Sequence, residues 1–271
     1  MSKLQFTLLQ TALFWEDKQS NLQSIESKLK ASAGSGQVIV LPEMFTTGFS
    51  MSPSKLSEPM DGATMQWMKR LAGELKSVIT GSFIAEEKSN YYNRMVWMLP
   101  TGAFGYYDKK HLFGFAGEDK HYSSGYKRLI ASVNGWRINL LVCYDLRFPV
   151  WARQQFNDAN EFEYDVLVYV ANWPEKRSLA WKILLQARAI ENQCYVIGVN
   201  RVGLDGNEIN YSGNSMVIDP LGEVLYHKED AEDLFTITLD KQHLDEARRK
   251  FPFWKDADRF ELFSDNNAES A

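Results

Sequence analysis

Residues 138–145, with the sequence INLLVCYD, join a strongly apolar run to a thiol and a carboxylate. The apolar run is short and continuous, which is typical of a strand that is covered on both faces. Two more runs of this kind occur, VIVLPE at 38–43 and VLVYVANWP at 166–174. In α/β sheets, ligands bind beyond the carboxyl ends of such strands. We therefore expect an α/β protein whose site lies near Glu43 and Cys143.

Helical periodicity alternates with strand signals along the rest of the chain. Apolar residues three and four positions apart predict helices over 22–29, 65–75, 149–156 and 179–190. Strands are predicted over 4–8, 38–41, 78–84, 95–99, 103–107, 138–142, 166–170, 195–199 and 234–239, with a hairpin over 216–227. Ser20 or Asn21 is the expected cap of the first helix. Because several strands are apolar on both faces, we expect two layers of helix over a two-sheet core.

Length and composition exclude several classes of protein. The 271 residues correspond to about 1.8 average domains, and 45% of them are hydrophobic, so the chain can bury a full core. A net charge of −5 makes nucleic acid an unexpected partner. The two cysteines, Cys143 and Cys194, exclude a disulfide framework and fit a reducing compartment. Signal-peptide and membrane-helix patterns are absent, so we expect a cytoplasmic protein with no membrane partner.

The C-terminal region is rich in aromatic residues. We expect residues 1–245 to form one domain and residues 246–271 to form a tail that packs on this domain or on a partner subunit. Such a tail cannot bury its aromatic rings alone, which favours a dimer, although packing on its own domain is an equal alternative. The aromatic residues concerned are Phe251, Phe253, Trp254, Phe260 and Phe263.

Cys143 has two possible roles. Most free cysteines are buried and inert, but this one follows a buried strand at a predicted strand-to-helix turn. The free N–H groups of such a turn favour a thiolate and can hold an oxyanion. Cys194 lies at the opposite end of a strand and is assigned to the core. No histidine forms a recognisable pair with Cys143, and no zinc-ligand spacing occurs.

A carboxylate and an ammonium can complete a thiol-based site. Glu43 follows an apolar strand, so burial can raise its pKa toward that of a general base, although most glutamates lie in solvent. The segment YDKKHLF at 107–113 has two adjacent lysines, which usually mark a solvated loop. One of them can instead turn inward beside the thiol and stabilise negative charge on a carbonyl oxygen.

Three segments in order resemble the signatures of the nitrilase superfamily of carbon–nitrogen hydrolases. They are LPE at 41–43, YDKKHLF at 107–113 and CYDLRFP at 143–149, and the resemblance extends over about residues 4–239. It implies a single-domain α/β fold of the nitrilase type, a four-layer α-β-β-α sandwich. Members of this superfamily commonly pair through their helical layers, so the resemblance also implies a homodimer or a higher homo-oligomer.

The resemblance implies a role for each reactive residue. Glu43 corresponds to the general base, Lys109 to the lysine that stabilises charge, and Cys143 to the nucleophile. Glu118 lies where the superfamily often has a second glutamate. The implied reaction passes through a thioester that water hydrolyses, with the oxyanion held by Lys109 and the backbone N–H of Tyr144. It requires no metal ion and no organic cofactor.

The segment NWPEKR at 172–177 and the helix after it most resemble the bacterial omega-amidase branch. That branch releases ammonia from monoamides of dicarboxylic acids such as 2-oxoglutaramate. A guanidinium is the best partner for the remote carboxylate of such a substrate, so Arg177 is the candidate contact and Trp173 a candidate pocket wall. Arg177 can equally lie in solvent at a helix start.

Three alternative functions remain open at this stage. The first is hydrolysis of another small amide, a carbamoyl compound or a nitrile on the same scaffold. The second is a redox-active thiol at Cys143, which needs a resolving cysteine and leaves Glu43 and Lys109 without a role. The third is a catalytically inactive binding protein, which the retention of all three reactive residues disfavours.

Overall fold

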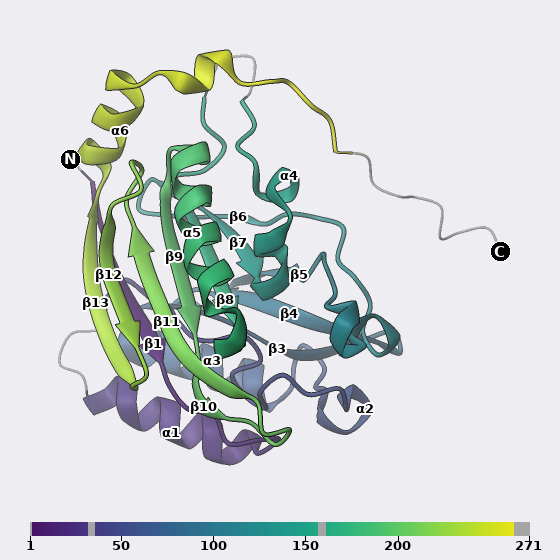
Figure 1. Ribbon diagram of the computed structural model, residues 1–271. Coiled ribbons are helices and arrows are strands. Elements are labelled where there is room, and N and C mark those ends of the chain that lie inside the picture. The colour runs from purple at the N-terminus through teal and green to yellow at the C-terminus, as the bar shows by residue number, and fades with distance from the viewer. Residues whose placement is uncertain (1, 32–35, 157–160, 263–271) are drawn as a thin grey trace.

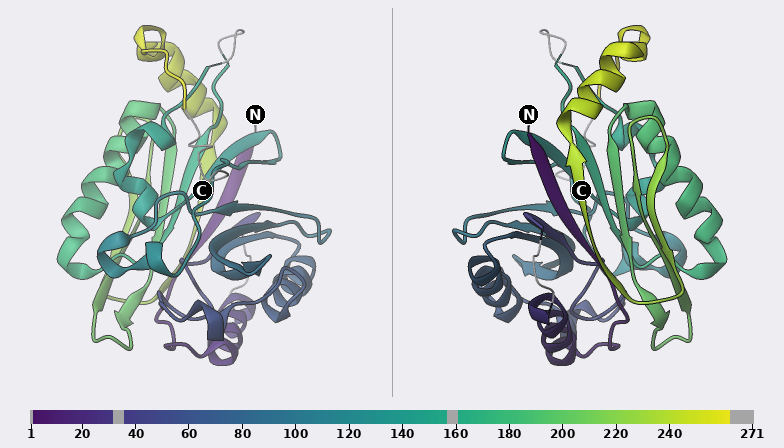
Figure 2. Two further views of the ribbon diagram at one scale, coloured as in Figure 1. Left: turned by 90° about the vertical axis from the view of Figure 1, so that its right-hand side faces the viewer. Right: turned by 90° about the vertical axis from the view of Figure 1, so that its left-hand side faces the viewer.

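Two β-sheets pack face to face, and helices cover the outer face of each sheet (Figures 1 and 2). The structure is a computed structural model that describes residues 2–31, 36–156 and 161–262. Its four layers follow the order helix, sheet, sheet, helix, as Figure 2 shows. The predicted α-β-β-α sandwich is therefore confirmed, and it forms a single α/β domain.

The first sheet has six strands in the order β13-β1-β2-β3-β4-β5. Its strands are β1 (Lys3–Gln10), β2 (Val38–Val40), β3 (Val78–Glu87), β4 (Asn90–Met98), β5 (Phe104–Asp108) and β13 (Asp233–Asp240). The central strands β1, β2 and β3 run parallel, and the others pair antiparallel. Its helical layer contains α1 (Lys18–Ala31) and α3 (Ala63–Leu75), and the short α2 (Pro53–Leu56) precedes α3.

The second sheet repeats this plan with seven strands. The path is β10-β11-β9-β8-β7-β6, and β12 pairs with β11. Its strands are β6 (Ile130–Val133), β7 (Trp136–Val142), β8 (Val166–Ala171), β9 (Tyr195–Asn200), β10 (Val202–Leu204), β11 (Asn210–Ile218) and β12 (Val224–Glu229). Strands β7, β8 and β9 run parallel. Helices α4 (Pro149–Ala152) and α5 (Ser178–Asn192) cover its outer face, and α6 (Lys241–Lys250) follows β13.

The three apolar runs that predicted the fold are the central strands of the two sheets. Every residue of β2 and of β8 is buried, because a sheet lies on one side of each strand and a helix on the other. The same burial explains why these strands show no alternation of polar and apolar residues. Cys194 is fully buried just before β9, as expected for a core residue.

Two local predictions were wrong. Helix α1 begins at Lys18, so Ser20 lies inside its first turn, and Asp17 accepts hydrogen bonds from Ser20 N (3.0 Å) and Oγ (2.7 Å). The helix predicted over 149–156 ends at Ala152, because Arg153 has an extended backbone. Gln154 instead uses its side chain to bind the backbone of Tyr164.

The expected boundary between the domain and the tail, after residue 245, lies inside helix α6. Beyond α6, the Trp254 ring lies 5.3 Å from the ring of Phe156 and 5.5 Å from that of Phe162, both on the same chain. Arg248 anchors the segment further, since its guanidinium binds Asp165 and the backbone of Tyr164. Phe263 lies outside the described residues.

Candidate active site

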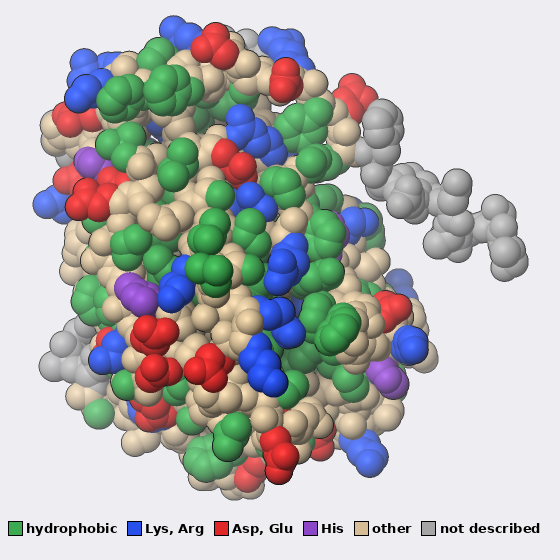
Figure 3. Space-filling model, viewed as in Figure 1, with side chains coloured by type: hydrophobic (Ala, Val, Ile, Leu, Met, Phe, Trp, Pro, Cys, Tyr) green, Lys and Arg blue, Asp and Glu red, His purple; other side chains and the backbone are tan. Residues whose placement is uncertain are grey.

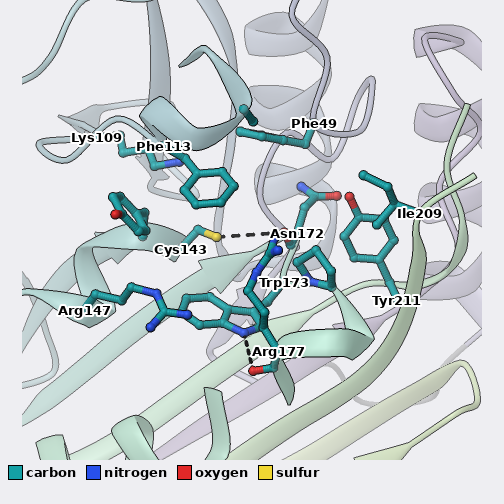
Figure 4. Close-up of a pocket in the computed structure, with 13 residues that line it drawn as sticks. Phe49, Lys109, Phe113, Cys143, Arg147, Asn172, Trp173, Arg177, Ile209 and Tyr211 are labelled. Atoms are coloured by element: carbon teal, nitrogen blue, oxygen red, sulfur yellow. Dashed lines mark hydrogen bonds between the residues drawn. The ribbon is translucent and has the colours of Figure 1, made fainter. Parts of the chain in front are cut away.

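The ends of strands from both sheets meet at one pocket, shown in Figure 4. Glu43 follows β2 and Lys109 follows β5 in the first sheet, and Cys143 follows β7 in the second. Asn172, directly after β8, completes the set. The structure thus brings together residues that lie up to 129 positions apart in the chain, the separation of Glu43 and Asn172.

Lys109 lies at the centre of a buried charged cluster. Its Nζ is 3.0 Å from Oε1 of Glu43 and 2.8 Å from Oε2 of Glu118, and none of the three side chains has more than 1% exposure. Burial acts to lower the pKa of Lys109, but the carboxylates of Glu118 and Glu43 outweigh it and raise this pKa. The two carboxylates therefore favour the charged form of Lys109. Two paired carboxylates also explain how a charge can be stable in this interior.

Neutral amides complete the cluster. The side-chain NH₂ of Asn93 donates to Oε1 of Glu43 at 2.7 Å and to Oε1 of Glu118 at 3.3 Å. Asn172 binds Glu43 twice, through its backbone N–H to Oε2 (2.7 Å) and through Nδ2 to the backbone carbonyl (2.6 Å). Glu118 accepts a further hydrogen bond from the backbone N–H of Phe113 at 2.6 Å. Both carboxylates are therefore held in one orientation.

The backbone of Cys143 is strained. Its φ of +45° lies in the left-handed region, which costs an ordinary residue on the order of 1 kcal/mol. Cys143 also begins a short 3₁₀ helix, Cys143–Arg147. This sharp turn directs the thiol into the pocket, where Sγ lies 3.9 Å from the backbone carbonyl of Asn172 (Figure 4).

The surroundings of Cys143 oppose ionisation of its thiol. Burial and the nearby Glu43 carboxylate raise the pKa of this thiol well above its usual value, and Lys109 only partly opposes them. Burial likewise raises the pKa of Glu118, with Lys109 acting in the opposite direction. A raised pKa makes the thiol harder to ionise, so a reaction at sulfur requires a base that removes its proton.

The family model described as carbon-nitrogen hydrolase matches residues 6–249. The chain belongs to this family. Omega-amidase YafV of Escherichia coli K12 is 46% identical over 97% of this chain and 100% of its own length. The 2-oxoglutaramate amidase of Bacillus subtilis 168 is 31% identical over 94% of this chain and 97% of its own length.

A solved structure is also similar to this chain. It is a CN-hydrolase superfamily protein from Xanthomonas campestris with an arsenic adduct in its active site. The sequences are 43% identical, the TM-score is 0.95, and the match covers 97% of this chain and 100% of that one. The predicted nitrilase-type family and fold are thereby confirmed, and the protein is an enzyme, a carbon–nitrogen hydrolase.

The pocket of this hydrolase contains all three residues that were expected to contact substrate. Tyr144, Trp173 and Arg177 line it together with Lys109 and Cys143. The indole N–H of Trp173 donates to the backbone carbonyl of Arg177 at 2.8 Å, which fixes the ring against the start of α5. Arg177 is half-buried at the start of α5, where it lines the pocket.

Sequence reasoning missed a second arginine in the pocket. Arg147 is half-buried, and its guanidinium carbon lies 4.9 Å from the centre of the Trp173 ring. The guanidinium carbon of Arg177 lies 5.2 Å from the Phe113 ring. Within the described part of the chain, neither guanidinium forms an ion pair. Arg147 follows Cys143 by four residues inside the motif CYDLRFP, so its position in the sequence was a usable signal.

The role of Asn93 was also missed. A lone asparagine in a strand has no distinctive pattern, and its contacts with Glu43 and Glu118 require the folded sheet.

Among the helices of the described ranges, none has the length and apolar character of a membrane-spanning helix.

Proposed function

We propose that this hydrolase releases ammonia from the ω-amide of a small dicarboxylic acid monoamide, such as 2-oxoglutaramate, through a thioester on Cys143. One observation carries the proposal: the Cys143 thiol and the Lys109 ammonium share a pocket with two guanidiniums that form no ion pair with any described residue. The similarity to an omega-amidase and a 2-oxoglutaramate amidase supports the same substrate class.

Acylation begins with the neutral thiol. Glu43 removes the proton of Cys143 as Sγ attacks the amide carbon, which avoids forming a free thiolate in a buried site. The negative charge that develops on the amide oxygen is stabilised by the ammonium of Lys109 and the backbone N–H of Tyr144. Glu43 then transfers the proton to the leaving nitrogen. Ammonia departs and the acyl group stays on sulfur as a thioester.

Deacylation reverses these proton transfers. Water enters the position that ammonia has left, and Glu43 removes its proton as the oxygen attacks the thioester carbon. The same ammonium and N–H stabilise the second oxyanion. Collapse of this intermediate releases the carboxylic acid and returns the proton to sulfur. Glu118 keeps Lys109 aligned throughout, because both of its oxygens lie within 3.0 Å of Nζ.

Substrate selection depends on the other end of the pocket. The carboxylate of the acyl chain binds Arg177 and Arg147, since a planar guanidinium matches a carboxylate in charge and geometry. Between these charges and the thiol, the wall consists largely of apolar side chains, which fit a short methylene chain. The wall residues are Phe49, Phe113, Ala116, Trp173, Pro174 and Ile209.

A substrate panel tests the proposal. Ammonia release is measured with 2-oxoglutaramate, succinamate, glutamine, a carbamoyl amino acid and a simple nitrile. We expect 2-oxoglutaramate and succinamate to be preferred, and Cys143→Ala to abolish their turnover while the matched variant Cys194→Ala retains it. Turnover by Cys143→Ala would reject the thioester mechanism. Preference for the carbamoyl compound or the nitrile would reject the substrate class but keep the family.

We further propose that the hydrolase forms a homodimer through α5. Apolar side chains gather over this helix in Figure 3, and Leu179, Ile183 and Ile190 are each more than half exposed. A second copy would cover this face, in agreement with the pairing that the superfamily resemblance implies. Analytical ultracentrifugation should find a dimer that Ile183→Asp dissociates. An unchanged sedimentation coefficient in the variant would contradict this interface.

A further inference from the structure

Asp145 is a buried carboxylate that lies outside the substrate pocket. It has no exposure, and it is not among the residues that line the pocket around Cys143. Its Oδ2 accepts the backbone N–H of Val142 at 2.9 Å, which closes the turn that holds Cys143. The same oxygen accepts the hydroxyl of Tyr107 at 2.7 Å. One carboxylate oxygen therefore connects the thiol turn to the end of β5.

The other oxygen of Asp145 binds the loop that follows β5. Oδ1 lies 3.0 Å from the backbone nitrogen of His111 and 2.8 Å from Nδ1 of its ring. Tyr107 and His111 stand two residues before and two residues after Lys109. Asp145 itself stands two residues after Cys143. The carboxylate thus holds both sides of the segment that carries the lysine and one side of the turn that carries the thiol.

Secondary contacts make this arrangement rigid. The hydroxyl oxygen of Tyr107 accepts Nε1–H of Trp151 at 3.0 Å and the backbone N–H of Lys110 at 3.2 Å. The ring of His111 stacks on Phe148, with centroids 3.9 Å apart. A strained backbone such as that of Cys143 persists only where its surroundings determine its conformation. The hydrogen bonds to Asp145 provide such surroundings.

We infer that Asp145, with Tyr107 and His111, is a positioning network that sets the placement of the Cys143 thiol relative to Lys109 without touching the substrate. The inference rests on the proposed roles of Cys143 and Lys109. Its physical basis is that these two groups come from different sheets, so no local backbone geometry fixes their separation. A shared carboxylate supplies that constraint.

The test compares Asp145→Asn and Tyr107→Phe with Tyr169→Phe. Tyr169 is a matched control, because it is fully buried and its hydroxyl forms no hydrogen bond with any described residue. For each variant we measure kcat and KM with 2-oxoglutaramate, and the rate at which iodoacetamide alkylates each cysteine. Displacement of a reacting group by about 1 Å can lower a rate by about 100-fold. We expect kcat to fall by about 10- to 100-fold in both network variants, with less than a threefold change in KM.

Alkylation separates positioning from general destabilisation. A loosened turn moves the thiol away from Glu43 and toward solvent, so Cys143 should be alkylated several-fold faster even though kcat falls. Cys194 is fully buried in the core and reports global opening, so it should remain unmodified. Tyr169→Phe should match the wild type in every measurement. If Asp145→Asn does not fold, Tyr107→Phe decides the question.

Three results would overturn the inference. They are a kcat within twofold of the Tyr169→Phe control, equal acceleration of alkylation at Cys143 and Cys194, and a lower kcat with unchanged alkylation of Cys143. Failure of the proposed function is distinguishable from these results. It appears as absence of ammonia release by the wild type, in which case the alkylation rates still decide on the network.

Discussion

The two ends of the pocket treat charge in opposite ways. At the inner end the pocket reaches Lys109, which is buried together with Glu43 and Glu118, and each of these charges has an opposite partner within 3.0 Å. At the outer end, Arg147 and Arg177 are half-buried and form no ion pair with any described residue. Charges in a dry interior must be paired, whereas partly hydrated guanidiniums can stay unpaired until a ligand arrives. The inner end is therefore suited to chemistry and the outer end to recognition.

The sharpest test of the inner end is Glu43→Gln. The amide preserves the shape of the side chain but cannot accept a proton, so kcat should fall by about 10²- to 10⁴-fold. Quenched-flow measurement of ammonia should find no acylation burst. Glu86→Gln, an exposed glutamate on β3, is the control and should behave as the wild type. A normal burst in Glu43→Gln would show that Glu43 is not the general base. It would also contradict the proposal that the inner end of the pocket performs the chemistry and the outer end the recognition.

Substitution at the outer end should change specificity more than chemistry. Hydrogen bonds to charged groups contribute about 1.5–3 kcal/mol. Arg177→Ala and Arg147→Ala should each lower kcat/KM for succinamate by about 10- to 100-fold, mainly through KM. For a neutral amide of the same length, kcat/KM should change little. Arg259→Ala, at an exposed arginine of the C-terminal segment, serves as the control. Equal losses on the charged and neutral amides would contradict recognition by these guanidiniums.

Asn93→Ala tests whether the inner end needs its neutral donor. The substitution removes hydrogen bonds to Glu43 and Glu118 and leaves two carboxylates with Lys109 as their shared side-chain donor. A lost buried hydrogen bond costs about 1–3 kcal/mol, so the free energy of unfolding should fall by this amount and kcat by about tenfold. Chemical denaturation and steady-state kinetics measure the two effects. A variant with unchanged kcat would show that Lys109 and the backbone N–H groups of Asn172 and Phe113 suffice to orient the carboxylates.

The smallest effect is expected where charges are paired but hydrated. On the surface of α1 and α3, Glu26 pairs with Arg70 and Lys30. These contacts, led by the hydrogen bond from Arg70, lower the pKa of Glu26 from 4.5 to about 2. Because the folded-state pKa is depressed, the pairing stabilises the protein above pH 4.5, and this contribution is lost as the pH falls toward 2.

Solvent screening keeps this contribution small. Glu26→Gln should lower the free energy of unfolding at pH 7 by about 1 kcal/mol or less and leave kcat unchanged. Urea denaturation at a series of pH values should find that the difference between wild type and variant disappears in acid. A change in kcat would show that an exposed ion pair on α1 and α3 also affects catalysis. Burial would then not be what distinguishes the catalytic charges from the surface charges.

Several features of the site could be predicted from residues in sequence. Glu43 and Cys143 each follow a short apolar run. The end of such a run marks the end of a buried strand, so both residues can be placed from the sequence alone. The two adjacent lysines were harder, because the residues alone did not say which one turns inward. The resemblance pointed to Lys109. In the structure Lys109 is buried directly after β5, where its ammonium pairs with Glu43 and Glu118, whereas Lys110 is half-buried.

Contacts between distant segments could not be predicted. Asn93, Asp145 and Arg147 carry no pattern of their own, because their significance depends on partners that other strands bring beside them. Glu43 and Lys109 are 66 residues apart, and Tyr107 and Asp145 are 38 apart. Such distances are closed by the pairing and stacking of sheets, which depends on the whole core.

The sequence by itself thus determined the central strands, the layered α/β fold and the reactive groups at the strand ends, because hydrophobic periodicity and motif spacing are local properties of the chain. Only the tertiary structure decided which charges are paired and which wait for a ligand. Both depend on burial and on distances of a few ångströms between side chains from different sheets. The thiol illustrates the difference: its turn alone favours a thiolate, but burial beside Glu43 keeps it protonated.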